Sequence, residues 1–236
     1  MVIRANDARL LVEAMQIFLL TISYNNVSIV IGYSETMSHQ TDQIIALARQ
    51  KGIIRPRDLV MLGLDHRYLA KLVSEGCIVK SGHGLYHLAD YDVTESHGLV
   101  EAVSAQAKGV VCLATALNFH GIGTQLPHKV WLSVPYGSWI AVKKSVPMRI
   151  IVMRSPGYES GIQIHRLEGV DVPIYNIPKT ISDCFKFRNK IGLDVALEAL
   201  REVLRDRRCT REEIRHFAKI NRVEKIMQPY MEALSG

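Results

Sequence analysis

Residues 42–89 read DQIIALARQKGIIRPRDLVMLGLDHRYLAKLVSEGCIVKSGHGLYHLA, and this stretch decides the fold of the N-terminal part of the chain. Asp42 can cap a helix, and the apolar positions after it recur at helical spacing as far as Gly52. This pattern predicts a first helix. Pro56 then stands at the first position that proline favours in a helix, so a second, short helix follows.

A turn and a third helix come next. Leu59 and Val60 are expected to face inward from the second helix, which Gly63 ends. Asp65 is expected to cap the third helix. In that helix Leu69, Leu72 and Val73 form an apolar stripe, and Leu59, Leu69, Leu72, Val73 and Leu85 are predicted to be core residues.

A hairpin follows the third helix. The runs Cys77–Lys80 and Leu85–Leu88 are strand-like, and glycines in the residues 81–84 between them permit a tight reversal. Helix, helix, turn, helix and hairpin occur in the order of a winged helix-turn-helix, which places a helix in the DNA major groove and a hairpin beside it. Winged domains that contact only protein remain an alternative to binding of duplex DNA.

Eight side chains are predicted to contact DNA. The leading end of the third helix would supply base and phosphate contacts, the start of the second helix would clamp phosphate, and the hairpin would touch the neighbouring backbone or minor groove. In chain order these residues are Arg55, Arg57, His66, Arg67, Tyr68, Lys71, Lys80 and His83.

Composition agrees with a folded protein that attracts polyanions. The 236 residues suffice for two domains, 48% of them are hydrophobic and 22% charged, and the formal net charge is +6. The four cysteines include no Cys-x-x-Cys pair and the nine histidines are dispersed, so no metal site, disulfide framework or cofactor is predicted. A reducing, cytoplasmic setting fits this cysteine pattern.

Residues 1–36 differ from the rest of the chain. No charged side chain occurs from Ala14 to Ser34, but Asn25 and Asn26 would lie near the centre of a membrane helix, which is costly. A membrane contact is therefore not predicted. We interpret residues 1–36 as an extension, either disordered or upstream of a natural start at Met37.

Residues 93–236 are predicted to form a second, α+β domain behind the winged helix-turn-helix of residues 37–92. The pattern predicts helices, strands and two long closing helices. The helices are expected at Leu99–Val103 and Val111–His120, the strands at Val130–Val134, Met148–Met153, Ile162–His165 and Val172–Ile174, and the closing helices at Ser182–Phe187 and onward and at Gly192–Arg207. The predicted fold is α+β, a winged helix-turn-helix followed by a mixed α/β domain.

Catalytic patterns are missing from the second half. The chain contains no Glu-x-Lys triplet and no phosphate-cradling glycine loop, and no carboxylate follows the Gly137–Ser138 turn until Glu159. No catalytic residue is predicted. Arginines such as Arg201, Arg205 and Arg215 recur near the carboxyl end, either as a solvated face paired with glutamates or as a surface for an acidic partner or flanking DNA.

From residue 40 to the end, the chain resembles the AbiEi antitoxins of bacterial type IV toxin-antitoxin systems. The resemblance lies in QIIALARQKGIIRPRDL, the Tyr-Leu-x-x-Leu-Val-x-x-Gly helix ending at Gly76, the Gly84–Tyr86 strand, ATALNFHGIGTQLPHKVWLSVP (Ala114–Pro135) and the run from Ile177 through KTISDCFKFRNKIGLDVALEALRE. It implies a repressor of its own operon whose second domain counteracts a nucleotidyltransferase-like toxin without a stable complex.

Two alternatives to that function remain. The first is a stand-alone winged-helix transcriptional regulator with a ligand-sensing or dimerisation domain, which would show the same N-terminal elements and have no toxin gene beside it. The second is an enzyme directed to DNA, which would need acidic residues converging on a metal ion in the second domain.

Overall fold

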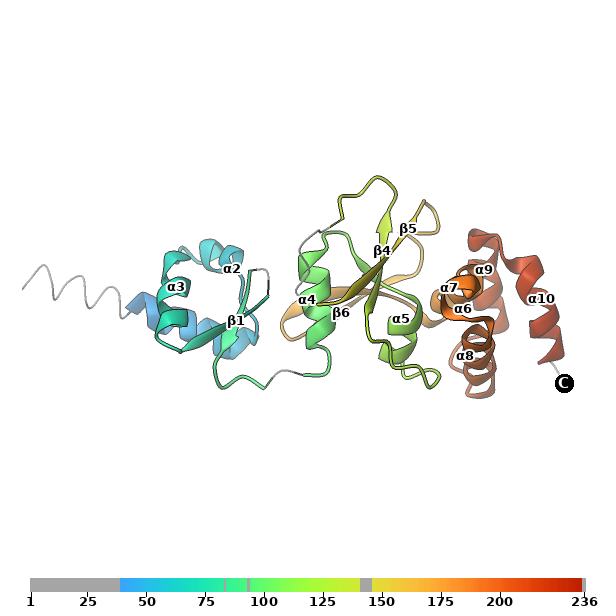
Figure 1. Cartoon of the computed structure of the whole chain (residues 1–236), viewed down its shortest axis with the longest axis horizontal. Helices are drawn as coiled ribbons and strands as arrows, with labels where there is room; N and C mark the ends of the chain where they lie inside the picture. The colour runs from blue at the N-terminus through green and yellow to red at the C-terminus, as the bar shows by residue number, and fades with distance from the viewer. Residues whose placement is uncertain (1–38, 83, 93, 141–145, 235–236) are drawn as a thin grey trace, which may run out of the picture.

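The computed structural model describes residues 39–82, 84–92, 94–140 and 146–234. The prediction for residues 1–36 lies outside this part of the chain. Figure 1 shows three parts along the long axis: helices and a hairpin at the N-terminal end, a five-stranded sheet in the middle, and helices α6 to α10 at the C-terminal end. The fold is mixed α+β, as predicted.

The N-terminal part, called the head (the described residues between 39 and 92), has its elements in the predicted order. They are helical residues 39–51, α2 (Pro56–Met61), α3 (Arg67–Ser74), β1 (Ile78–Gly82) and β2 (Leu85–Leu88). The two strands form an antiparallel hairpin. An isolated antiparallel bridge joins Ile54 to Tyr86 and ties the segment before α2 to the hairpin.

The inner faces of these elements enclose a hydrophobic cluster. Ile44, Leu59, Leu69, Leu72 and Ile78 are all buried in it. Each such side chain contributes about 1.5–3 kcal/mol relative to an exposed one, before the cost in conformational entropy. This cluster holds the outer face of α3 at a fixed orientation.

Some details of the head differ from the sequence-based prediction. Val60 is 63% exposed and Val73 is 37% exposed, so neither belongs to the core. Successive helix residues are about 100° apart, so Leu59 can face inward only if Val60 turns away. Asp42 lies within the helical residues 39–51 instead of capping them, and β1 continues from Ile78 through Gly82.

The sheet has the strand order β5-β4-β3-β7-β6. Its strands are β3 (Val110–Val111), β4 (Val130–Pro135), β5 (Met148–Met153), β6 (Ile162–Leu167) and β7 (Val170–Tyr175). β4 pairs in parallel with β5 and β3 with β7, whereas β3–β4 and β6–β7 are antiparallel. The four predicted strands are present, but β3 lies at the centre of the sheet and was not predicted.

The helices of the second half are α4 (His97–Ala105), α5 (Leu113–Phe119), α6 (Ile177–Lys186), α7 (Arg188–Ile191), α8 (Leu193–Arg205), α9 (Arg211–Asn221) and α10 (Glu224–Ala233). The prediction of two long closing helices is wrong. α6 begins before Ser182, and α9 and α10 follow α8. Thr210 and Glu213 form a capping box at the start of α9, a signal that the sequence carries openly.

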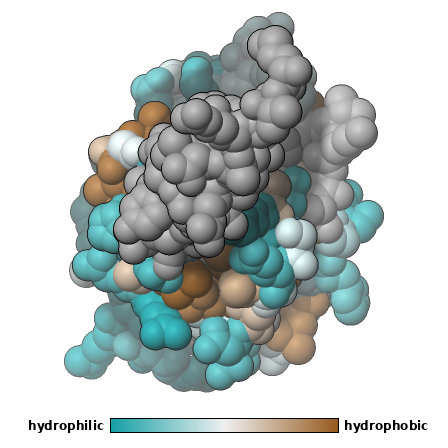
Figure 2. Space-filling model, turned by 90° about the vertical axis from the view of Figure 1, so that its left-hand side faces the viewer, coloured by the Kyte–Doolittle hydropathy of each residue, from teal (hydrophilic) through white to brown (hydrophobic). Residues whose placement is uncertain are grey.

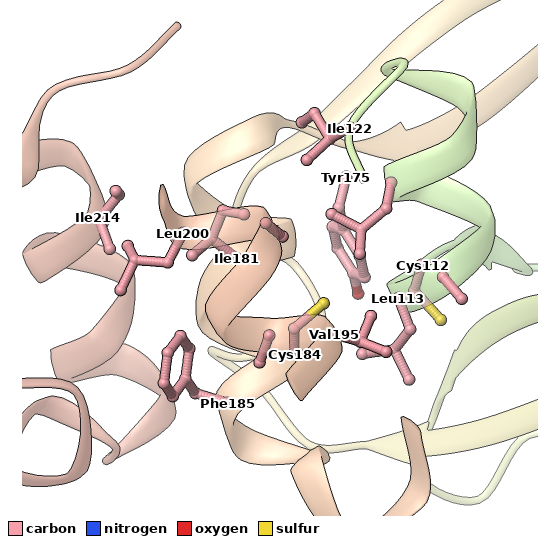
Figure 3. Close-up of a cluster of buried hydrophobic side chains, with 14 of the residues drawn as sticks. Cys112, Leu113, Ile122, Tyr175, Ile181, Cys184, Phe185, Val195, Leu200 and Ile214 are labelled. Carbon is pink, nitrogen blue, oxygen red and sulfur yellow. The ribbon is translucent and has the colours of Figure 1, made fainter. Parts of the chain in front are cut away.

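Side chains from the sheet and from the C-terminal helices share the largest core. Tyr175 of β7, Leu113 of α5, Phe185 of α6, Leu200 of α8 and Ile214 of α9 are all buried in one cluster. Figure 3 shows α6, which carries Phe185, between Leu113 on one side and Ile214 on the other. Helices α6, α8 and α9 therefore share one hydrophobic core with the sheet.

The head is joined to the sheet by a further hydrophobic cluster. Ile53 and Leu85 of the head are buried with Val100 of α4 and Val170 of β7. At Gly169, in the turn between β6 and β7, an added Cβ would collide with the carbonyl oxygen of Lys51. The division into residues 37–92 and 93–236 remains a prediction, because the apolar packing continues across that boundary.

Candidate nucleic-acid interface

The outer face of α3 and the residues just before it carry positive charge. Leu69 and Leu72 are buried on the inner face, whereas the side chains of His66, Arg67 and Lys71 are 62%, 84% and 40% exposed. A helix with one buried side and one basic, solvent-facing side can enter a major groove without losing its packing. The fold thus brings these three predicted residues together on one free surface.

Asp65 organises the leading end of this face. Its carboxylate accepts hydrogen bonds from the backbone N–H of Arg67 at 2.9 Å and from Arg67 Nε at 2.7 Å. The hydrogen bonds from Arg67 hold the pKa of Asp65 below its usual value. Asp65 was predicted to cap this helix, but the cap residue is His66, and Asp65 instead accepts from the N–H of Arg67, the first residue of the helix.

Lys71 and Tyr68, two of the residues predicted to contact DNA, each lie against another part of the head. Lys71 Nζ lies 3.7 Å from Glu75 Oε1, one turn further along the helix. Tyr68 is half-buried and packs against the head cluster with Leu69. Its ring therefore supports α3 from the side, and only part of it faces solvent.

The two arginines at the start of α2 have different surroundings. Arg57 is exposed. Arg55 is half-buried. Its burial, and after that the positive charge of Arg57, lowers its pKa. The charges of Arg166 and Asp171 in the β6–β7 hairpin also act on this pKa. Arg55 therefore lies at the junction between the head and the sheet. Its Nε is 3.9 Å from Asp58 Oδ2, which is too far for a hydrogen bond.

Asp58 fixes the start of α2 from inside the head. It accepts hydrogen bonds from Lys51 Nζ and from the backbone N–H of Arg55, both at 2.9 Å. Burial works to raise the pKa of Asp58, but the bond from Lys51 and the bond from Arg55 bring it below its usual value. This ionised carboxylate was not among the predicted residues, although its position three after Arg55 follows the spacing of a capping box.

The hairpin packs on one side against the other elements of the head and on the other side against α4. Lys80 is exposed, with Nζ 6.0 Å from the centre of the Tyr86 ring on the paired strand. His83, predicted to contact DNA, lies outside the described residues. Next to it, a Cβ added at Gly82 would meet Glu101 of α4. The hairpin is therefore supported by the second half of the molecule.

Apolar side chains also reach the surface of the head. Val60, Met61 and Leu62 are all more than half exposed at the end of α2. Figure 2 views the molecule from the head end and shows hydrophobic residues lying among hydrophilic ones on the described surface. The end of α2 therefore offers exposed apolar side chains for van der Waals contact with a partner.

Two negative findings apply to residues 39–234 outside the undescribed positions. No three His, Cys, Asp or Glu side chains there come together in a way that could hold a metal ion. Every helix in that part of the chain is too short or too polar to span a bilayer.

Comparison with known proteins identifies part of the chain. Residues 42–89 match the family described as "Transcriptional regulator, AbiEi antitoxin". This confirms the family resemblance over the helices and hairpin of the head. No curated protein matches the chain.

A solved structure resembles most of the molecule. It is the crystal structure of the RV2827C protein from Mycobacterium tuberculosis, with 10% sequence identity and a TM-score of 0.54 over 82% of this chain and 81% of that one. At this identity the likeness concerns the fold alone. The similarity extends well beyond residues 42–89, so the two chains share the arrangement of most of their elements.

Proposed function

Because residues 42–89 match the AbiEi antitoxin family of transcriptional regulators, we propose that the head is a winged helix-turn-helix that binds duplex DNA at the operator of its own operon. α3 is the recognition helix and the β1–β2 hairpin is the wing. The observation that carries the proposal is the exposed basic face of α3, where Arg67 and Lys71 stand opposite a fully buried apolar face.

The predicted residues take distinct roles in this proposal. Arg67 and His66 reach base edges, because they stand at the leading end of the helix that enters the groove. Arg57 and Lys80 contact phosphates, as does Lys71 further along α3. Arg55 acts at the edge of the interface, where it also orders the junction with the sheet. Tyr68 positions α3 from the side.

Binding to its own upstream DNA tests the regulatory role. The full chain is titrated, by fluorescence anisotropy at near-physiological salt, with duplex DNA from upstream of its gene and with an unrelated duplex of equal length. A preference of about a thousandfold for the upstream DNA is expected of a specific regulator. Equal, weak binding to both duplexes contradicts operator recognition.

Salt dependence separates phosphate contacts from base contacts. The logarithm of the binding constant should fall linearly with the logarithm of salt concentration, because phosphate contacts release counterions. Arg57→Ala is expected to reduce that slope by about one and to weaken binding to both duplexes alike. An unchanged slope removes Arg57 from the phosphate contacts.

The family description also supports a role against a toxin. In this proposal the second half of the chain counteracts a nucleotidyltransferase-like toxin without forming a stable complex and without catalysis of its own. The same protein would work in the cytoplasm, where a regulator of this kind meets DNA. Co-expression with the toxin encoded beside its gene tests this role, since growth should recover.

Two controls make that test specific. Arg67→Ala, which alters only the exposed face of the head, should still restore growth when the antitoxin is expressed from an unrelated promoter. Size-exclusion chromatography of the two purified proteins should show separate peaks. A stable joint peak contradicts action without a complex, and failure to restore growth contradicts the antitoxin role.

A further inference from the structure

A pocket in the second half is lined by positive charge. It has a volume of about 320 Å³ and lies between the turn after β5, the end of α6 and the end of α9. Arg154, Lys186 and Arg222 line it, together with Asn221, and no carboxylate does. Figure 1 shows α6 and α9 at the end of the molecule opposite the head, so this pocket is separate from the proposed DNA interface.

The three cations make no ion pair with any carboxylate of the described residues. The carboxylate of Asp183, which is buried and does not line the pocket, already accepts hydrogen bonds from Lys179 and Asn221. Glu159, on the turn after β5, accepts one from Ser155. The charges that line the pocket are thus available to an anion from outside.

Buried polar groups hold Lys186 in place. Its Nζ donates a hydrogen bond of 3.3 Å to Asn221 Oδ1. Asn221 is almost fully buried, and its Nδ2 donates to Ser182 Oγ at 2.8 Å and to Asp183 Oδ1 at 2.7 Å. Burial lowers the pKa of Lys186, and the ordered surroundings mean that an anion would meet the amino group already in position.

The two arginines are also held by local structure. The guanidinium of Arg154 lies 4.5 Å from the centre of the Tyr136 ring, over its face. Arg222 ends α9 in the left-handed conformation with φ of 60°. Guanidinium groups bind phosphate in a planar, two-point geometry, and phosphate is the common biological anion that matches several converging cations.

An exposed aromatic ring stands beside the cations. Tyr136 is 69% exposed, although its backbone N–H is fixed by a hydrogen bond to Met153 at the end of β5. Aromatic side chains next to basic groups bind nucleotides by stacking on the base while the cations hold the phosphate. The ring and the pocket are linked directly, because Arg154 touches both.

We propose that this pocket binds the phosphate group of a nucleotide, with Arg154, Lys186 and Arg222 as its ligands and Tyr136 as the stacking surface for the base. The nucleotide is either free or the 5′ end of a single-stranded RNA. The site does not depend on the DNA-binding role of the head.

Binding measurements on the full chain test the site. Binding of AMP, adenosine and inorganic phosphate is measured by isothermal titration calorimetry. Binding of a short single-stranded RNA with a 5′-phosphate is measured by fluorescence anisotropy. AMP is expected to bind more tightly than phosphate, and adenosine is expected not to bind measurably. RNA binding without AMP binding supports the site with the RNA end as its ligand, provided that the variants below weaken it.

Arg154→Ala and Arg222→Asn should each weaken binding by about tenfold or more, the effect of losing a charge-assisted hydrogen bond. Asparagine is chosen at position 222 because it tolerates the left-handed conformation. Arg205→Ala is the matched control, since it removes an exposed arginine of α8 that pairs with Asp206. Tyr136→Ala should weaken AMP binding more than phosphate binding, because AMP loses the stacking surface for its base, whereas phosphate loses only the support that the ring gives to Arg154.

The proposal is overturned if neither AMP, phosphate nor RNA binds, or if Arg205→Ala weakens binding as much as the two pocket variants do. Equal loss of AMP and phosphate affinity in Tyr136→Ala removes the stacking role. Circular dichroism verifies that each variant folds. If Arg222→Asn does not fold, the result for Arg154→Ala alone decides whether the pocket binds the probe. Arg67→Ala, altered in the head only, should bind AMP like the unaltered chain.

Discussion

At the scale of single residues, Arg67 is the side chain on which the proposed base recognition depends most. Arg67→Ala is expected to lower affinity for operator DNA by roughly ten- to a hundredfold and affinity for unrelated DNA much less, because a base contact is lost. Competition binding with the two duplexes measures this ratio. Arg205→Ala removes a comparably exposed arginine, paired with Asp206, and should change neither affinity.

If Arg67→Ala weakened both duplexes equally, Arg67 would be a phosphate contact and would not read sequence. The pairing with Asp65 makes a second variant informative. Asp65→Asn keeps the side-chain shape but weakens the hold on the Arg67 guanidinium, so it is expected to reduce the preference for operator DNA less than Arg67→Ala does.

Glu168 gives the junction a dependence on pH. Its carboxylate lies 2.8 Å from His97 Nδ1 and accepts hydrogen bonds from Thr94 N and Oγ1. Burial works to raise the pKa of Glu168, but the bonds from His97 and Thr94 bring it below its usual value. Because the folded pKa is the lower one, this stabilisation is present above the unfolded pKa of about 4.3 and is lost as pH falls through the folded value.

Thermal unfolding at several pH values tests this prediction with Glu168→Gln as the comparison. The unaltered chain should be more stable than Glu168→Gln near neutral pH, and the difference should shrink as pH falls below about 4.3. A difference that stays constant at acid pH would show that the ionised carboxylate does not stabilise the junction.

At the scale of elements, the turn between β6 and β7 joins the sheet to the head. Gly169 has a φ of 75°, and a Cβ there would meet the carbonyl of Lys51. An alanine in the left-handed conformation costs about 1–2 kcal/mol. Gly169→Ala is expected to destabilise the protein by more than that, because its Cβ also meets the carbonyl of Lys51. Chemical denaturation measures the change in the free energy of unfolding.

Gly137→Ala provides the matched control for that change. Gly137 has a φ of 81°, and nothing lies within 4 Å of its added Cβ, so only the backbone cost applies. Equal destabilisation by the two variants would show that the close approach of the turn to Lys51 contributes nothing to stability.

Sequence patterns located the elements that are long and strongly periodic. β5 has the predicted bounds, and α8 begins and ends close to the prediction. β3 was missed because two residues, Val110 and Val111, carry no alternation that could be recognised. α9 was missed because its charged residues were interpreted as a solvated face or a basic surface and not as a separate helix, although Thr210 and Glu213 signal its start.

At the scale of the whole molecule, the shared apolar cluster should couple the head to the sheet. Leu85 of β2 is buried with Val100 of α4, whereas Leu69 of α3 is buried within the head cluster. Either leucine replaced by alanine is expected to cost about 2–5 kcal/mol. Hydrogen exchange should then accelerate in α4 for Leu85→Ala more than for Leu69→Ala.

That comparison uses two variants of the same chemistry in one head. Equal acceleration in α4 would mean that the head unfolds as a unit and carries α4 with it. No acceleration in α4 from Leu85→Ala would support two independent domains at the predicted boundary after residue 92. The Leu69→Ala variant shows how far loss of the head core alone is transmitted.

The sequence by itself determined the order of helices and hairpin in the head, the α+β class and the basic residues of α3, because these depend on local periodicity, capping and turn residues. The tertiary structure decided which of those residues are free. It brought Arg55 within electrostatic range of Arg166 and Asp171, set Gly82 against Glu101, and brought Arg154, Lys186 and Arg222 around one pocket. These side-chain arrangements depend on how strands and helices far apart in the chain pack together, and a local sequence pattern does not predict that packing.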